Sequence, residues 1–339
     1  MTDTETRQEL TGKLTGKLTG KEIKDLISTI TVNSGMCGFE VYVIAKSEPR
    51  LKKMEFVEDG GDNFRQKLKV SILRTLSDKY NADDADYVSA DRIADEQRKF
   101  YIIPTSDKYD PLSVLKATPG TFSKSDIGDA TGIAFSFRVE DKHLWAYQHL
   151  WSIMVPNRSK KNWMARIISS KQGDVFVEMT DPIITITEKI DLLVIGDNII
   201  ASNYKLLQNS FGFQDYIRIR ADKTIDAVEA KGIIANVDKL RDYVQRGNGK
   251  PKYAKKMMRI TDSKVLKMDT AILWENIHRS ARWNGKIREE NGKFVLDTYV
   301  QVENLIDLLD ERYTRSDITD TEYDTEVKQV AEPVDGGTQ

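Results

Sequence analysis

The hydrophobic pattern of the chain changes its period near residue 203, and this change constrains the fold more than any other feature. Before it, β-rich segments such as TGIAFSFRVE and HLWAYQHLW follow one another at close intervals. After it, apolar residues recur at helical spacing. Strands followed by helices indicate an α+β architecture rather than alternating βαβ units. The sequence therefore predicts an antiparallel meander sheet over roughly 130–203, followed by a mainly helical C-terminal half.

Individual elements follow from the same periodicities. An amphipathic helix is predicted at 63–80, and strands are predicted at 39–46 and in KFYIIP. Within the meander, further strands are expected in DVFVEM, PIITITE, IDLLVIG and NIIASN. The helical half is expected to contain helices at 204–211, 214–230, 236–245, 252–259, 268–280 and 298–312, with a hairpin within 283–297.

The two ends of the chain differ from the middle. The unit LTGK occurs three times between Leu10 and Lys21, and its glycine opposes helix formation. We therefore expect residues 1–21 to be a flexible leader, followed by an N-terminal α/β region at 22–125. At the other end, 326–339 is predicted to be a disordered tail. A length of 339 residues suggests two domains in total.

Composition argues against several classes of function. No apolar run is long enough to span a membrane and no secretory signal begins the chain, so we expect a cytoplasmic protein. Cys37 is the single cysteine, and no HExxH motif surrounds the three histidines. Neither GxGxxG after a strand nor a GxxxxGK[ST] phosphate loop occurs. We expect no enzyme activity, no catalytic residue, no metal and no cofactor.

The net charge of the whole chain is only −2, so attraction of an anionic ligand must come from local clusters of cations. Two basic clusters give the strongest functional signal. Cations without intervening acids can follow a phosphate backbone together, and an aromatic ring among cations can stack on an unpaired base. We therefore predict DNA binding through these segments. The first cluster comprises Arg246, Lys250, Lys252, Lys255, Lys256 and Arg259, and the second places Arg158, Lys160, Lys161, Arg166 and Lys171 around Trp163.

Other interpretations of the same residues stay open. Each basic cluster can be a solvated loop without a ligand. Glu178 and Asp181, at a predicted strand end, make a metal-dependent nuclease acting on DNA the alternative function. A third possibility is a scaffold whose sheet edge docks on a membrane component while its basic loops contact anionic lipid. The alternating His and aromatic residues of HLWAYQHLW are more typical of a sheet packed against helices than of a binding face.

The second half of the chain resembles a known family. DLLVIGDNIIASN followed by YKLLQNSFGF is similar to the central signature of the KwaB family, the second component of the Kiwa anti-phage defence system. The resemblance covers about 130–325. Arg312 departs from it, because a second acidic residue is expected there. The terminal pattern of this family is matched by Leu308, Leu309, Asp310, Tyr313, Ser316 and Thr319.

The resemblance implies a fold region and partners. It implies a KwaB-like region at 126–325, made of a sheet and then helices. It also implies a cytoplasmic effector that binds DNA to block late phage functions. A small multi-pass membrane protein of the KwaA type would recruit it peripherally to the inner membrane in a membrane-associated complex. We further expect a homodimer, and the resemblance assigns no catalytic residue.

Overall fold

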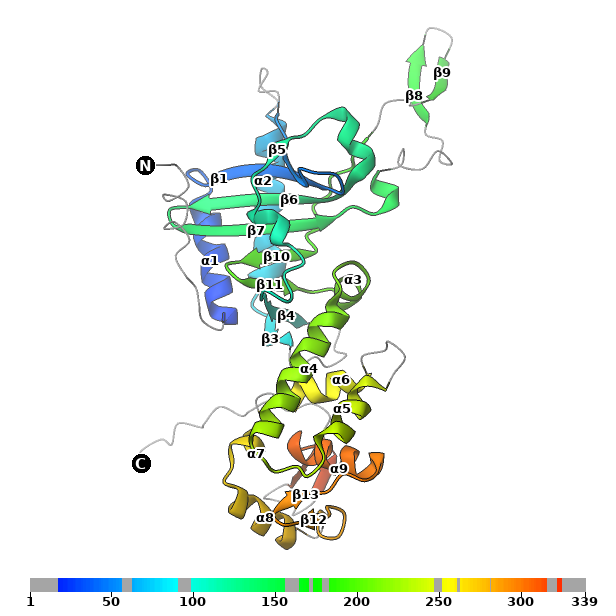
Figure 1. The fold of residues 1–339 in the computed structure, drawn as a ribbon. Helices are drawn as coiled ribbons and strands as arrows, with labels where there is room; N and C mark the ends of the chain where they lie inside the picture. Colours follow the sequence, from blue (N-terminus) through cyan, green and yellow to red (C-terminus); the bar gives the residue numbers. More distant parts are fainter. Residues whose placement is uncertain are drawn as a thin grey trace, which may run out of the picture. The chain divides into compact units, whose positions relative to one another are not determined.

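The computed structural model describes residues 18–56, 63–90, 99–155, 165–170, 173–178, 183–246, 252–260, 263–280, 282–315 and 322–324. The chain divides into two compact units (Figure 1). The first contains Met1–Val88 and Arg98–Leu207, and the second contains Ser89–Gln97 and Gln208–Gln339. Helices and a large sheet are both present, which confirms the α+β class.

The first unit contains a nine-stranded sheet with the order β3-β4-β11-β10-β7-β6-β1-β2-β5. Every neighbouring pair from β4 to β2 is antiparallel, whereas β2 and β5 run parallel. The strands are β1 (Gly38–Ala45), β2 (Leu51–Lys53), β3 (Asp86–Ser89), β4 (Lys99–Pro104), β5 (Gly120–Thr121), β6 (Ala130–Val139), β7 (Lys142–His149), β10 (Leu192–Ile195) and β11 (Asn198–Ala201).

The predicted simple antiparallel meander is wrong, because the sheet is mixed and its strands are not in sequence order. The pairs β6–β7 and β10–β11 are local hairpins, and here the pairing of consecutive strands expected of a meander is correct. However, β4 pairs with β11, and β1 pairs with β6, across long stretches of sequence. Alternation of apolar residues identifies a strand but does not identify a distant partner, so these pairings were not predictable from periodicity.

One face of the sheet is covered by two helices, α1 (Gly20–Val32) and α2 (Phe64–Thr75) (Figure 1). A π-helical turn at Leu76–Tyr80 continues α2, so the predicted helix at 63–80 is confirmed with a wider last turn. Thr19 and Glu22 form a capping box at the start of α1. The core between helices and sheet is apolar and includes Ile23, Ile27, Ile30, Phe39, Val41, Leu68, Ile72, Phe135 and Phe137.

Two of the predicted meander strands, DVFVEM and PIITITE, are not part of the large sheet. The strands β8 (Ala165–Ser170) and β9 (Gly173–Glu178) pair only with each other among the described strands. The described part of PIITITE, 183–188, forms no strand, so this prediction is wrong. The Gln148 side chain explains the difference, because its amide nitrogen donates to the carbonyl oxygens of Thr187 and Lys189 over 3.0 and 2.8 Å. Side-chain bonds thus replace ladder bonds there.

The second unit is mainly helical, as predicted. The helices of the second unit are α4 (Phe213–Ala230), α5 (Val237–Gln245), α6 (Lys252–Arg259), α7 (Lys264–Lys267), α8 (Thr270–Arg279) and α9 (Tyr299–Leu309). The division between the two units falls within the preceding helix, α3 (Tyr204–Ser210). The predicted helix at 268–280 is confirmed as α8, which Asp269 caps, and the short helix α7 before it was not predicted.

Short strands complete the second unit. The predicted hairpin is present as β12 (Glu289–Glu290) and β13 (Lys293–Phe294). Asn291 and Gly292 form its turn with φ of 55° and 74°, the left-handed values that a tight two-residue turn requires. A further pair is formed by β14 (Tyr313–Arg315) and β15 (Glu322–Asp324). Most of the predicted leader and the whole predicted tail lie outside the described residues.

Candidate nucleic-acid interface

The structure describes the first basic cluster in part and the side chains of the second not at all. Arg246 directly follows α5, and Lys255, Lys256 and Arg259 lie on α6. Lys252 begins α6 and Arg166 lies on β8, but their side chains are not described. The predicted contact residues that lie wholly outside the described residues are Lys250, Arg158, Lys160, Lys161, Trp163 and Lys171.

Helix α6 is amphipathic, and two of its lysines lie at the margin of its buried face. Ala254, Met257 and Met258 are buried with at most 1% of their surface exposed. Lys255 and Lys256 are half-buried. Long lysine side chains can place their apolar stems against a core and keep the ammonium group in water. The two methionines therefore anchor the helix to the second unit, and the half-buried lysines can still present their charge to solvent.

Arg259 has a different role from the one predicted for it. Its guanidinium lies 3.1 Å from a carboxylate oxygen of Asp310, the residue that ends α9. Both side chains are largely buried, at 27% and 17% exposed. A similar pair joins Arg312 to Asp307 over 3.4 Å. The charge of Arg259 is therefore compensated within the fold.

Tyr299, which the sequence reasoning missed, lies beside Arg246. The guanidinium carbon of Arg246 is 3.7 Å from the centre of the Tyr299 ring. The ammonium nitrogen of Lys239 is 4.6 Å from the same ring centre. The Tyr299 hydroxyl donates to a carboxylate oxygen of Asp242, and this bond raises the pKa of the tyrosine. Two cations and one carboxylate thus surround one half-buried ring.

The arrangement depends on the packing of α5 against α9. Lys239, Asp242 and Arg246 recur at spacings of three and four residues, which places them on one side of α5. Thr298 and Gln301 form a capping box, so α9 begins at Tyr299. The helical spacing on α5 was available from the sequence. The partner ring on α9 was not, because nothing local to α5 indicates which helix packs against it.

Aromatic rings connect this surface to the start of α6. The ring of Tyr243, on α5, lies 6.0 Å from that of Tyr299 and 4.4 Å from that of Tyr253 on α6. Tyr243 is 1% exposed, and its hydroxyl donates to Glu303 over 2.9 Å. Burial, together with Glu303, raises the pKa of Tyr243. Lys256 follows Tyr253 by three residues and so lies on the same side of α6.

A second polar cluster lies on the sheet of the first unit. Along β7, Leu144 and Ala146 belong to the core under the helices, so His143 and Trp145 lie on the opposite face. The Ser136 hydroxyl and His143 Nε2 are 2.9 Å apart. Burial, reinforced by Arg138, lowers the pKa of His143 to about 4. Ser136 is only 1% exposed, so this pair is a buried hydrogen bond rather than an accessible nucleophile.

The nuclease alternative has one described residue. Glu178 ends β9, with its side chain not described, and Asp181 lies outside the described residues. Among the residues that the structure describes, no group of three or more His, Cys, Asp or Glu side chains is placed to hold a metal ion.

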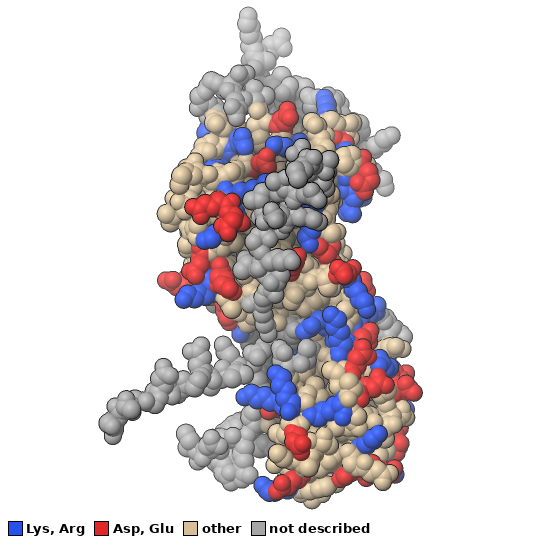
Figure 2. Space-filling view, turned by 60° about the vertical axis from the view of Figure 1, so that its left-hand side comes forward, with Lys and Arg blue, Asp and Glu red and all other residues tan. Residues whose placement is uncertain are grey.

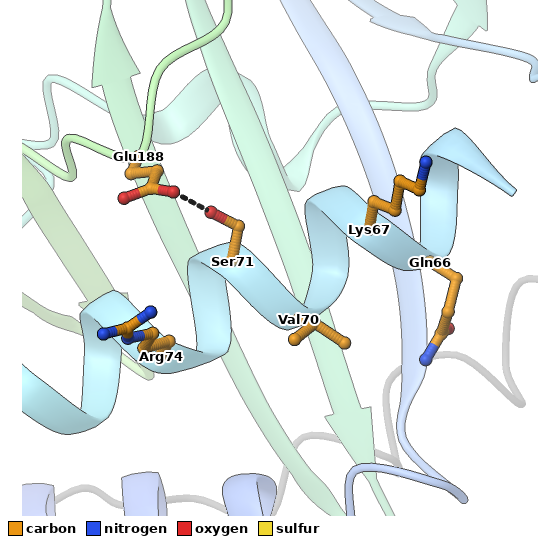
Figure 3. A pocket seen from close by; sticks show the side chains of 6 residues that line it. All are labelled: Gln66, Lys67, Val70, Ser71, Arg74 and Glu188. Atoms are coloured by element: carbon orange, nitrogen blue, oxygen red, sulfur yellow. Dashed lines mark hydrogen bonds between the residues drawn. The ribbon is translucent and has the colours of Figure 1, made fainter. Parts of the chain in front are cut away.

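A hollow of about 380 Å³ lies along α2 in the first unit (Figure 3). The Ser71 hydroxyl donates to Glu188 over 2.6 Å across it. Figure 3 shows Arg74 and Lys67 on the same helix, with Val70 between them. Val70 is 56% exposed. The hollow is wide and open, whereas a small-molecule site buries most of the surface of its ligand.

Charge on the visible face is mixed in sign. Figure 2 shows Lys and Arg side chains interspersed with Asp and Glu over both units. The Arg241 guanidinium illustrates this mixing, because it bonds to Asp226 and Glu229 over 2.8 and 2.6 Å. Attraction of an anionic ligand must therefore arise from a local cluster such as that around Arg246.

Comparison with known proteins identifies the family. The sequence model of the family described as "Kiwa protein KwaB-like" matches residues 127–319, which is more than half of the chain. No curated protein and no solved structure gave a significant match. None of the helices in the described ranges is long and apolar enough to cross a membrane. The match confirms the resemblance carried by the 191–213 and 308–319 segments, and the chain belongs to the KwaB-like family of Kiwa proteins.

Proposed function

We propose that this chain is a component of Kiwa anti-phage defence that binds DNA non-specifically through its second unit. The observation that carries the proposal is the meeting of α5 with the starts of α6 and α9, which brings Lys239 and Arg246 onto the Tyr299 ring and sets Tyr253 of the lysine-bearing helix α6 against Tyr243. Several cations on one surface attract a phosphate backbone because binding releases condensed counterions. Contacts to phosphate carry no base information, so the binding is independent of sequence.

The proposed contact set follows the basic cluster with one change. It comprises Arg246, Lys250, Lys252, Lys255 and Lys256. Arg259 leaves the set because it neutralises Asp310. The second basic segment, 158–171, stays a proposal from the sequence, and Arg166 within it lies on the β8–β9 hairpin.

Charge neutralisation tests the contact set. The double variant Lys255→Gln and Lys256→Gln is expected to weaken binding to a fluorescent duplex about tenfold at moderate salt, since two phosphate contacts are lost. The matched control is Lys205→Gln with Lys223→Gln, two exposed lysines on α3 and α4 outside the proposed set. Equal affinities for the two double variants would remove the basic cluster from the interface.

We also propose that the chain acts on DNA by occupying it, without cutting it. Covering DNA requires only that the protein bind it, and the cationic surface would supply that affinity. A nuclease would instead need Glu178 and a divalent metal. Plasmid incubated with the protein and magnesium or manganese is expected to stay intact. Cleavage that disappears in Glu178→Ala would replace this proposal with the nuclease.

Association with a membrane partner is proposed from family membership. A multi-pass protein of the KwaA type would recruit this chain from the cytoplasm to the inner membrane, and the chain would assemble as a homodimer. Fractionation of cells with and without the partner tests the recruitment, and we expect the chain in the membrane fraction only when the partner is present. Light scattering of the purified chain tests the dimer, and a monomer mass would contradict it.

A further inference from the structure

Tyr299 and Arg246 form a layered contact on the surface of the second unit. The Tyr299 ring is held at its hydroxyl by Asp242, four residues before Arg246 on α5. The guanidinium of Arg246 lies at van der Waals distance from the ring, 3.7 Å from its centre. Arg246 is an exposed residue. One side of its guanidinium is therefore fixed against a ring while the group remains accessible to a ligand.

This contact is more than a phosphate site needs. A point charge suffices to neutralise a phosphate, and a lysine supplies it without a supporting ring. Here Asp242 fixes the ring, Lys239 adds a second cation 4.6 Å from the ring centre, and Tyr243 lies beside the ring at 6.0 Å. The start of α9 is already fixed by the Thr298 and Gln301 capping box. Neither phosphate binding nor helix capping accounts for the position of Tyr299.

A supported guanidinium plane matches the face of an unpaired base. Bases stack on aromatic side chains and on arginine planes in sites that bind single strands, and cation–π attraction adds to the stacking. Bases within a duplex are already stacked on their neighbours, and exposing one costs unpairing and unstacking energy. Arg246 and Tyr299 thus provide a contact that is available to an unpaired nucleotide and costly for a paired one.

We propose that the Arg246–Tyr299 layer is a stacking site for an unpaired nucleotide, so the surface binds single-stranded DNA in preference to duplex. This inference rests on the proposed DNA-binding function, because the flanking cations would hold the backbone on either side of the stacked base. Phosphate contacts supply binding to both forms, whereas the layer contributes to binding of the single strand.

The test compares the two forms of DNA with variants that separate charge from stacking. Arg246→Lys keeps the charge and removes the plane, and Tyr299→Leu removes the ring beneath it. Lys223→Gln, on the exposed side of α4, is the control. Affinities of the full chain for a fluorescent oligothymidine and for a duplex of the same length are measured at one salt concentration. Far-ultraviolet circular dichroism checks that each variant is folded.

The measured quantity is the ratio of single-strand to duplex affinity. Either layer variant is expected to lower the ratio about tenfold, within the range for loss of one stacked base, and the control is expected to leave it unchanged. A 2-aminopurine placed in the single strand is expected to be quenched by the wild-type chain and less by Arg246→Lys. An unchanged ratio in both layer variants would overturn the stacking site while leaving DNA binding intact. Failure of the wild-type chain to bind either DNA would overturn both proposals.

Discussion

Arg259 and Asp310 form an ion pair of 3.1 Å between α6 and the end of α9, with both side chains largely buried. One partner comes from the basic cluster and the other from the terminal pattern of the family. Charges withdrawn from water depend strongly on their partner, because removing one leaves the other desolvated and unpaired. Arg259 therefore belongs to the basic cluster in the sequence, but in the fold it stabilises the structure.

The largely buried pair predicts that replacing Arg259 lowers the stability of the fold more than replacing an arginine whose ion pair is exposed. Arg259→Met is expected to lower the free energy of unfolding by about 1 to 2 kcal/mol, since Asp310 loses its partner in a site that is still partly hydrated. Arg218→Met is the control, because its pair with Asp215 is exposed at 51% and 69% and is expected to matter by less than about 0.5 kcal/mol. Urea unfolding measures both, and equal losses would contradict the assignment.

Lys69 is a second charged residue with a structural role. Its ammonium group donates to the carbonyl oxygens of Ser34 and Cys37 over 2.6 and 2.7 Å, and the residue is 7% exposed. Lys69→Met keeps the length of the side chain and leaves both carbonyls without this donor. We expect a loss of about 2 kcal/mol in urea unfolding. Lys67→Met, at an exposed position of the same helix, is expected to change stability by less than about 0.5 kcal/mol.

His143 predicts a pH dependence of stability. Its folded-state pKa of about 4 lies below the ordinary value of 6.5, mainly because of burial. As the pH falls below that ordinary value, the unfolded chain takes up a proton that the folded chain does not, so stability falls until the pH reaches the folded pKa. Between about pH 7.5 and about pH 5 the histidine should contribute a loss of about 2 kcal/mol.

The variant His143→Asn isolates this contribution. Other groups titrate in both proteins, so the difference between their pH profiles reports His143 alone. The variant is expected to lose about 2 kcal/mol less than the wild type over the same interval. Parallel profiles in denaturant unfolding would mean that folding does not lower the pKa of His143.

Elements that depend on residues close together in the sequence were predicted correctly, whereas pairings between distant segments were not. The helices at 63–80 and 214–230 and the β6–β7 hairpin were found because their apolar spacing or their turn is local. The meander was wrong because β4 pairs with β11 and β1 with β6, which no local period encodes. The segment 183–188 reads as a strand by residue type, yet its backbone bonds to the Gln148 side chain.

The candidate site was predictable in charge but not in shape. The cluster at 246–259 is visible in the sequence as cations without acids between them. Charge alone did not separate Arg259, which is paired within the fold, from Arg246, which lies against a ring. Tyr299 and Lys239 were missed because their relation to Arg246 exists only after α5 packs against α9. The family pattern was recognisable because its residues are contiguous.

The central claim is that this chain binds DNA by contacting the phosphates of the DNA backbone. The salt dependence of the binding affinity tests this claim most directly. Affinity of the full chain for a fluorescent duplex is measured over a series of salt concentrations. The account predicts a steep linear fall of log affinity with log salt, with a slope of about 0.9 for each phosphate contacted, and a slope smaller by about 2 in Lys255→Gln with Lys256→Gln. Absence of binding at the lowest salt, or a slope near zero, would contradict it.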